Sequence, residues 1–169
     1  MFAWIHAKIS FLSFHLSEEK FETVELCRPT KNESSLLPDV ILIGVRKCGT
    51  GALQVFLRRN PDIVSSKWET HFFDNPERYS LGLKEYLRLL LKRQNDDQIL
   101  LERTPAYFYA PDVEKKIYAA MPSVKLLLIV RDPVTRMISD YVHFHVSRLK
   151  EPMKLRRFEV RPGLWVVCV

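Results

Sequence analysis

Hydrophobic residues occupy nearly every position of two short runs in the chain. The runs are VILIGV at 40–45 and VKLLLIV at 124–130. Continuous apolar runs of this length, rich in valine and isoleucine, predict strands that are buried on both faces. A third, shorter run at 98–101 is a further strand candidate.

Elsewhere the hydrophobic residues return every three or four positions, which is the spacing of a helix with one buried face. This spacing predicts helices at 50–59, 82–93, 112–121 and 133–149. Proline at 133 is compatible with the first turn of the last helix. Strands that alternate with helices predict an α/β fold built on a parallel sheet.

The first of these helices, at 50–59, carries two specific expectations. Its hydrophobic spacing places Phe56 on the buried face and Gln54 off it. Thr50 stands at the helix start, where its hydroxyl is predicted to cap the first turn. Asp112 is the corresponding cap candidate for the helix at 112–121.

Residues 1–36 are predicted to be a leader and linker before the folded part. The stretch 1–16 is apolar but is interrupted by His6, Lys8 and His15. Two interpretations remain open, a surface-lying amphipathic leader and the remnant of a signal or anchor. Because the chain has no run of about 18 apolar residues, no membrane-spanning helix is predicted.

Composition narrows the class of protein. The chain has 169 residues, 47% of them hydrophobic, with only 5 glycines and 10 prolines. This excludes collagen-like and disordered chains and allows one sizeable core. Lysine and arginine total 26 against 20 acidic residues, a net charge of +6. The excess points to an anionic partner: phosphate or sulfate groups, nucleic acid, an acidic polysaccharide or a membrane surface.

Three widely spaced cysteines without a C-x-x-C motif predict neither a disulfide framework nor a zinc site. The other residues of the chain do not predict a metal site either. The basic residues do not fall on one stripe, so a nucleic-acid partner is not expected.

Both long strands end in basic loops, GVRKCGT and VRDPVTR. In parallel sheets, ligands bind beyond the carboxyl ends of the strands. Gly44 and Gly49 have the spacing of a phosphate-binding loop, but Lys47 lies inside the loop instead of after it. Lys47 and the following helix N-terminus attract an anion. These features favour a nucleotide 5′-phosphosulfate over a Mg²⁺-bound triphosphate. The alternatives are an ordinary strand-to-helix turn and a P-loop kinase or nucleotide triphosphatase.

Four motifs, in order and at matching spacing, carry a family resemblance: LPDVILIGVRKCGTGAL at 37–53, ETHFFD at 69–74, ERTPAYF at 102–108 and RDPVTRMISDY at 131–141. The chain resembles the heparan sulfate glucosamine 3-O-sulfotransferases of the sulfotransferase superfamily. The resemblance implies a P-loop-like sulfotransferase fold. Residues 37–150 would form the N-terminal part of its domain and 151–169 an unmatched tail.

The resemblance also implies a donor, 3′-phosphoadenosine 5′-phosphosulfate (PAPS). Residues that match the family's 5′-phosphosulfate loop, with a flanking arginine, are Arg46, Lys47, Cys48, Gly49, Thr50 and Gly51. Arg131 and Ser139 match the contacts to the 3′-phosphate. An arginine at a strand end suits a phosphate group, which agrees with this assignment.

The remaining motifs imply the chemistry and the acceptor, the 3-hydroxyl of glucosamine in heparan sulfate. Glu69 matches the proposed catalytic base, while Lys47 and His71 would neutralise the transferring sulfonate. Substrate-binding residues implied by the match are Glu69, Thr70, His71, Asp74, Arg103 and Thr104. A solvated surface carboxylate and a packed core histidine are the alternatives for Glu69 and His71.

Three positions depart from the family pattern: Arg103 replaces a lysine, Cys48 a glycine and Gly51 an arginine. The resemblance also implies that the family domain continues beyond residue 150. From this truncation, together with Cys48 and Gly51, we expect either a transferase with impaired activity or a module that binds the nucleotide or the glycan without turnover. Location in the Golgi follows from the family alone. Membrane association is expected only if a longer form carries an N-terminal anchor.

Overall fold

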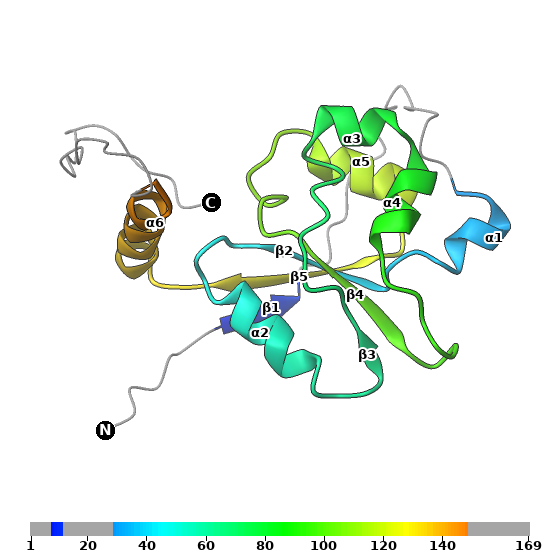
Figure 1. Ribbon diagram of the computed structural model, residues 1–169, viewed down its shortest axis with the longest axis horizontal. Helices are drawn as coiled ribbons and strands as arrows, with labels where there is room; N and C mark the ends of the chain where they lie inside the picture. The colour runs from blue at the N-terminus through cyan, green and yellow to red at the C-terminus, as the bar shows by residue number, and fades with distance from the viewer. Residues whose placement is uncertain (1–7, 12–28, 149–169) are drawn as a thin grey trace.

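The computed structural model describes residues 8–11 and 29–148, and its centre is a twisted five-stranded sheet (Figure 1). The strands are β1 (Lys8–Phe11), β2 (Val40–Gly44), β3 (Ile63–Val64), β4 (Ile99–Arg103) and β5 (Lys125–Val130). Their order across the sheet is β1-β5-β2-β4-β3. The pairs β2·β4, β2·β5 and β3·β4 are parallel. The expected α/β fold with a parallel sheet is therefore confirmed.

The central strands are buried because their side chains are apolar on both faces. Ile41 and Leu42 of β2 are fully buried, and Leu127 and Leu128 of β5 are each 7% exposed. The β2–β5 register places Leu42 opposite Leu127. The two longest apolar runs of the sequence thus form adjacent strands, and their carboxyl ends lie at the same edge of the sheet.

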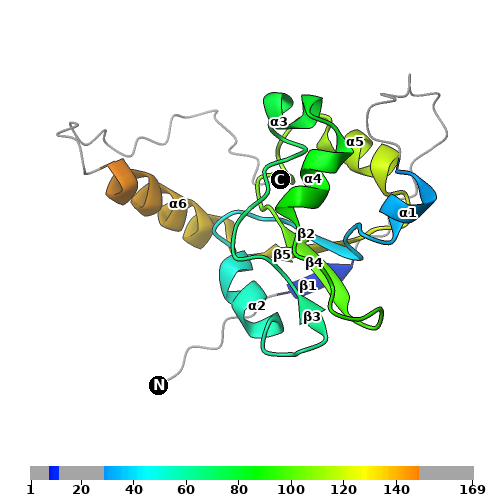
Figure 2. The same cartoon turned by 45° about the vertical axis from the view of Figure 1, so that its right-hand side comes forward.

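Helices lie on both sides of this sheet. They are α1 (Lys31–Ser34), α2 (Thr50–Leu57), α3 (Pro76–Ser80), α4 (Leu83–Leu89), α5 (Val113–Ala120) and α6 (Pro133–Arg148). Figures 1 and 2 show α3, α4 and α5 grouped on one side, α2 on the other, and α6 extending away from the end of β5. No helix of the described segments is long and apolar enough to cross a membrane.

The elements differ from the sequence prediction at several places. The predicted leader contributes β1, which pairs antiparallel with β5 at the sheet edge. The short elements α1, β3 and α3 were not predicted, because four, two and five residues are too few to show a hydrophobic period. The predicted tail at 151–169 lies outside the described residues.

Helix α2 differs from its prediction in which side chain is buried. Gln54 is 4% exposed, whereas Phe56 is 67% exposed. Thr50 is the first residue inside the helix, and the cap residue is Gly49, in a left-handed conformation with φ 94°. The predicted Thr50 cap is therefore wrong. Asp112 is the N-cap residue of α5, as predicted, but its carboxylate accepts from the Lys115 ammonium at 2.8 Å and makes no capping hydrogen bond to a helix N–H group.

An aromatic cluster fixes the segment that follows β3. Phe72 and Phe73 are fully buried, with ring centroids 5.0 Å apart. Tyr86 stacks on Phe72 at 4.9 Å, and Tyr107 meets Phe73 edge-on at 5.6 Å. Edge-on and stacked aromatic pairs add stability beyond the area that they bury. The cluster anchors one end of the segment that carries ETHFFD.

Candidate active site

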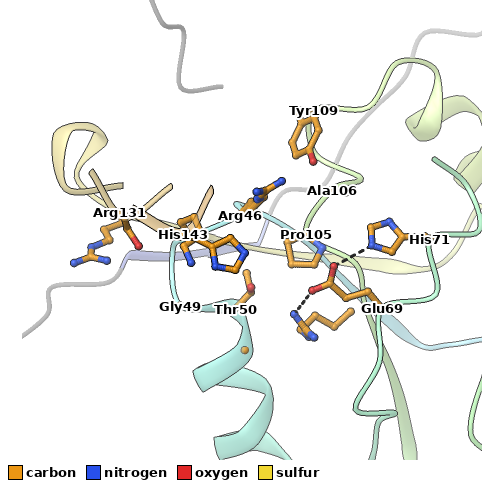
Figure 3. Close-up of a pocket in the computed structure, with 14 residues that line it drawn as sticks. Arg46, Gly49, Thr50, Glu69, His71, Pro105, Ala106, Tyr109, Arg131 and His143 are labelled. Carbon is orange, nitrogen blue, oxygen red and sulfur yellow. Dashed lines mark hydrogen bonds and ion pairs between the residues drawn. The ribbon is translucent and has the colours of Figure 1, made fainter. Parts of the chain in front are cut away.

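A cavity of about 600 Å³ opens at the sheet edge where β2, β4 and β5 end. Its lining comes from three strand-end segments, the segment around Glu69 and helix α6, as Figure 3 shows. The lining residues predicted from the sequence are Arg46, Lys47, Gly49, Thr50, Gly51, Glu69, His71, Arg103, Arg131 and Ser139. Residues far apart in the sequence thus meet where the parallel sheet predicts a ligand.

The loop after β2 has the backbone of an anion cradle. Lys47 and Gly49 both adopt positive φ, at 68° and 94°. These conformations lead directly into the N-terminus of α2, whose first N–H groups have no helical partner and attract negative charge. Between residues 29 and 148 the Lys47 ammonium makes no ion pair. It is therefore available to an anionic ligand.

Cys48 and Gly44 hold this loop against the core. Cys48 is 7% exposed and does not require the left-handed conformation that its two neighbours adopt. A Cβ atom on Gly44 would stand 2.7 Å from the Cβ of Phe108. Glycine at 44 thus allows the close approach of the segment after β4, and a cysteine at 48 fits the loop.

The end of β5 and the start of α6 form another part of the cavity lining. Arg131 is exposed at the end of β5, and Ser139 lies further along the helix. Asp140 on the same helix pairs with Nε of Arg46 at 3.3 Å. Asp132 accepts from the N–H of Thr135 at 2.9 Å and from its hydroxyl at 2.7 Å, and these bonds, the hydroxyl first, lower its pKa. The Asp132 carboxylate is therefore engaged by Thr135 in the first turn of α6.

Glu69 has both carboxylate oxygens engaged. Oε1 accepts from Nη1 of Arg103 at 2.7 Å, and Oε2 lies 3.2 Å from Nε2 of His71. The other ring nitrogen of His71, Nδ1, lies 2.8 Å from the Asp74 carboxylate. Figure 3 shows Glu69 and His71 facing each other. Because Glu69 lines the cavity, its carboxylate is within reach of a ligand bound there and is a candidate proton acceptor.

Arg103 links this carboxylate to helix α2. Its Nε donates to Oε1 of Gln54 at 2.8 Å while Nη1 donates to Glu69. The Nε2 group of Gln54 donates to the hydroxyl of Ser65 at 2.7 Å and to the carbonyl of Ser66 at 2.6 Å. The planar guanidinium suits two acceptors at once.

A buried polar network lies behind the cavity and holds the Glu69 segment. Oε1 of Glu102, which is 3% exposed, accepts from the hydroxyls of Thr70 at 3.0 Å and Thr104 at 2.5 Å. The Thr104 hydroxyl in turn accepts from the N–H of Thr70 at 3.1 Å, and the Tyr107 hydroxyl from the N–H of Phe72 at 3.2 Å. Burial raises the pKa of Glu102 to about 7, although both threonine hydroxyls oppose that shift.

The structure therefore divides the predicted site residues into two groups. Ten line the cavity. Cys48, Thr70 and Thr104 are buried behind it, and Asp74 reaches it only through His71. Sequence reasoning missed four lining residues, Pro105, Ala106, Tyr109 and His143, and the buried Gln54. The ERTPAYF motif contains Pro105 and Ala106, but the sequence assigned neither of them a role.

No cluster of three or more histidine, cysteine, aspartate or glutamate side chains within 8–11 and 29–148 has the arrangement of a metal site. The charged groups around the cavity are mainly cationic on the side of the β2 loop. The other side holds Glu69 with its two partners. The cavity thus combines a place for an anionic ligand with a place for a proton acceptor.

The chain is similar to curated proteins over most of its length. The chain is 42% identical over 123 residues to mouse heparan sulfate glucosamine 3-O-sulfotransferase 5, an alignment that covers 73% of the chain and 35% of the relative. It is 46% identical over 127 residues to human heparan sulfate glucosamine 3-O-sulfotransferase 6, an alignment that covers 75% of the chain and 36% of that relative. The chain thus spans about a third of the length of the curated relatives it matches.

A solved structure gives the same indication. A sulfotransferase from Alicyclobacillus acidocaldarius superposes with a TM-score of 0.58 at 28% identity, covering 71% of this chain and 54% of that one. Residues 37–161 match the protein family described as "Sulfotransferase domain". This span includes the loop after β2, the Glu69 segment and the start of α6. The chain belongs to the sulfotransferase domain family.

Proposed function

We propose that this chain transfers a sulfuryl group from PAPS to the 3-hydroxyl of a glucosamine residue in heparan sulfate. The proposal rests on one observation: Lys47, Glu69 and Arg131 line the same cavity. The curated relatives, which are 3-O-sulfotransferases of heparan sulfate, support the choice of acceptor. A location in the Golgi lumen is part of the proposal and rests on the family resemblance alone.

The residues on the β2 side fit the donor. The N–H groups at the start of α2 and the ammonium of Lys47 would bind the 5′-phosphosulfate. Arg131 and Ser139 would bind the 3′-phosphate, and Arg46 would lie beside the donor, held by Asp140. A cavity of about 600 Å³ is in the size range of sites for small molecules and cofactors.

The residues on the other side fit the transfer step. Glu69 takes the proton of the acceptor hydroxyl while that oxygen forms its bond to sulfur. The bond from sulfur to the 5′-phosphate oxygen breaks, and adenosine 3′,5′-bisphosphate leaves with the electron pair. Lys47 and His71 neutralise the charge on the transferring sulfonate and the leaving oxygen. Asp74 orients His71, and the buried Thr70 and Thr104 support the segment from behind.

A second candidate is a module that binds adenosine 3′,5′-bisphosphate or the glycan with little turnover. Gly51 favours it, because the side chain is absent where the family has an arginine. The space around Gly51 is open, with no atom within 4 Å of a Cβ built there. The donor side therefore has one cation fewer than the resemblance implies.

The test combines binding and turnover. Calorimetry with adenosine 3′,5′-bisphosphate should show binding, and sulfate transfer from PAPS to heparan sulfate should yield 3-O-sulfated disaccharides. Glu69→Gln should lower the transfer rate 10²- to 10⁴-fold, on the order expected for a general base, and leave nucleotide binding intact. Glu77→Gln, at an exposed carboxylate on α3, is the matched control. Unchanged turnover in Glu69→Gln would exclude Glu69 as the base, and binding without turnover would select the second candidate.

A further inference from the structure

Gln54 is a polar residue in a place where the helix pattern predicts none. It is 4% exposed, while its neighbours on α2, Val55 and Phe56, are 61% and 67% exposed. Its amide makes three hydrogen bonds: Nε2 donates to Ser65 Oγ and to the Ser66 carbonyl, and Oε1 accepts from Arg103 Nε. A carbonyl can only accept and a guanidinium can only donate, so these partners fix the orientation of the amide.

Arg103 is held at two of its three nitrogens. Nε is on Gln54 and Nη1 is on Glu69, at 2.8 and 2.7 Å. Nη2 has no hydrogen-bond partner in the part of the chain that the structure describes, and Arg103 lines the cavity. The side chain is only 12% exposed. With Nε and Nη1 held by these two partners, the plane of the guanidinium is fixed, and so are the directions of the two N–H donors of Nη2.

Lysine cannot reproduce this arrangement. Its stem has a methylene group where arginine has Nε–H, so it cannot donate to Gln54 and to Glu69 from separate atoms. The Oε1 atom of Gln54, which is buried, would then lose its partner. Gln54 and Arg103 are therefore a matched pair in this chain.

We propose that Gln54 is a positioning residue that aims Nη2 of Arg103 at a sulfate or carboxylate group of the acceptor glycan. The inference rests on the proposed function. The donor phosphates are assigned to the N-terminus of α2, whereas Arg103 is bound to the carboxylate that meets the acceptor hydroxyl. The anion that reaches Nη2 is therefore on the sugar chain, next to the hydroxyl that is sulfated.

The experiment measures binding of two hexasaccharides to the full chain by calorimetry. One is a heparan sulfate hexasaccharide with N-sulfate and 2-O-sulfate groups, and the other is its unsulfated counterpart. The variants are Gln54→Met, Arg103→Lys and the double variant. Val55→Ala, exposed on the same helix, is the matched control. Adenosine 3′,5′-bisphosphate binding and the melting temperature are measured for each protein.

We expect Gln54→Met to weaken binding of the sulfated hexasaccharide about tenfold, the size of one charge-assisted hydrogen bond. Nucleotide affinity should not change. Arg103→Lys should have a similar effect, and the double variant should be no weaker than Arg103→Lys alone, because Gln54 acts through Arg103. If Gln54→Met does not fold, Arg103→Lys tests the Nη2 contact directly, since it removes Nη2 and keeps the bonds of Gln54 to Ser65 and Ser66. Unchanged affinity of Arg103→Lys for the sulfated hexasaccharide would then overturn the inference.

Three results would overturn the inference: equal affinity of Gln54→Met and the unchanged chain for the sulfated hexasaccharide, an equal loss for both hexasaccharides, or an equal loss of nucleotide and glycan affinity. The last would mark Gln54 as a residue of general structural importance. Absence of nucleotide binding in the unchanged chain would instead refute the proposed donor site. The two failures are therefore distinguishable.

Discussion

Glu102 makes the stability of this protein dependent on pH in an unusual direction. Its side chain is buried at 3% exposure, and Oε2 has no hydrogen-bond partner within the described residues. Burial raises its pKa from the ordinary 4.5 to about 7. The folded state therefore binds the proton more tightly than the unfolded state. The resulting stability is fully present below pH 4.5 and is lost as the pH rises through 7.

The size of the effect follows from the two pKa values. The step from 4.5 to about 7, at about 1.4 kcal/mol per tenfold change in proton affinity, corresponds to about 3 kcal/mol. Glu102→Gln has the same shape and does not titrate. The amide oxygen keeps the hydrogen bonds of Thr70 and Thr104, while the amide nitrogen has no partner and lowers stability by about 1–3 kcal/mol at every pH.

Urea unfolding of both proteins at several pH values between 4.5 and 8.5, at constant salt, tests this prediction. The unfolding free energy of Glu102→Gln minus that of the unchanged chain should rise by about 3 kcal/mol across the range. Glu114→Gln, at an exposed position on α5, should show no such rise. A difference that is constant with pH would refute the reasoning.

Two glycines give further predictions. Gly44→Ala should destabilise the fold by about 1–3 kcal/mol in urea unfolding, because the new Cβ would stand 2.7 Å from Cβ of Phe108; unchanged stability would show that the loop yields freely. Gly51→Arg should tighten adenosine 3′,5′-bisphosphate binding about tenfold in calorimetry, since it restores a cation in open space. Gly51→Ala is the control for both experiments, because its Cβ would meet no neighbouring atom within 4 Å. If Gly51→Ala raised the nucleotide affinity as much as Gly51→Arg, the role of charge would be contradicted.

The strands and the donor loop could be predicted from the sequence because they depend on local patterns. The run at 40–45 is apolar throughout, which is the pattern of a central strand that is buried on both faces of the sheet. The loop that follows it contains Lys47 between two glycines, and the structure places Lys47 at the cavity. Motif order then located Glu69 and Arg131, which also line the cavity.

The contacts within the site could not be predicted, because they join residues that are distant in the sequence. Arg103 meets Glu69 across 34 positions and Gln54 across 49. The burial of Gln54 was mispredicted because the helical period assumes apolar partners, while the partners of Gln54 are the polar Ser65 and Ser66. Thr70 and Thr104 were assigned to the substrate from their motifs, but their hydroxyls point to Glu102.

The two partners of Glu69 also make its two oxygens unequal. Each oxygen already has one partner and keeps a further acceptor site for an incoming hydroxyl. Arg103 is 12% exposed and bonded at 2.7 Å, while His71 is 42% exposed at 3.2 Å. The histidine is the weaker and more accessible partner. If Glu69 is the base, Oε2 is therefore the more accessible of its two oxygens for the proton.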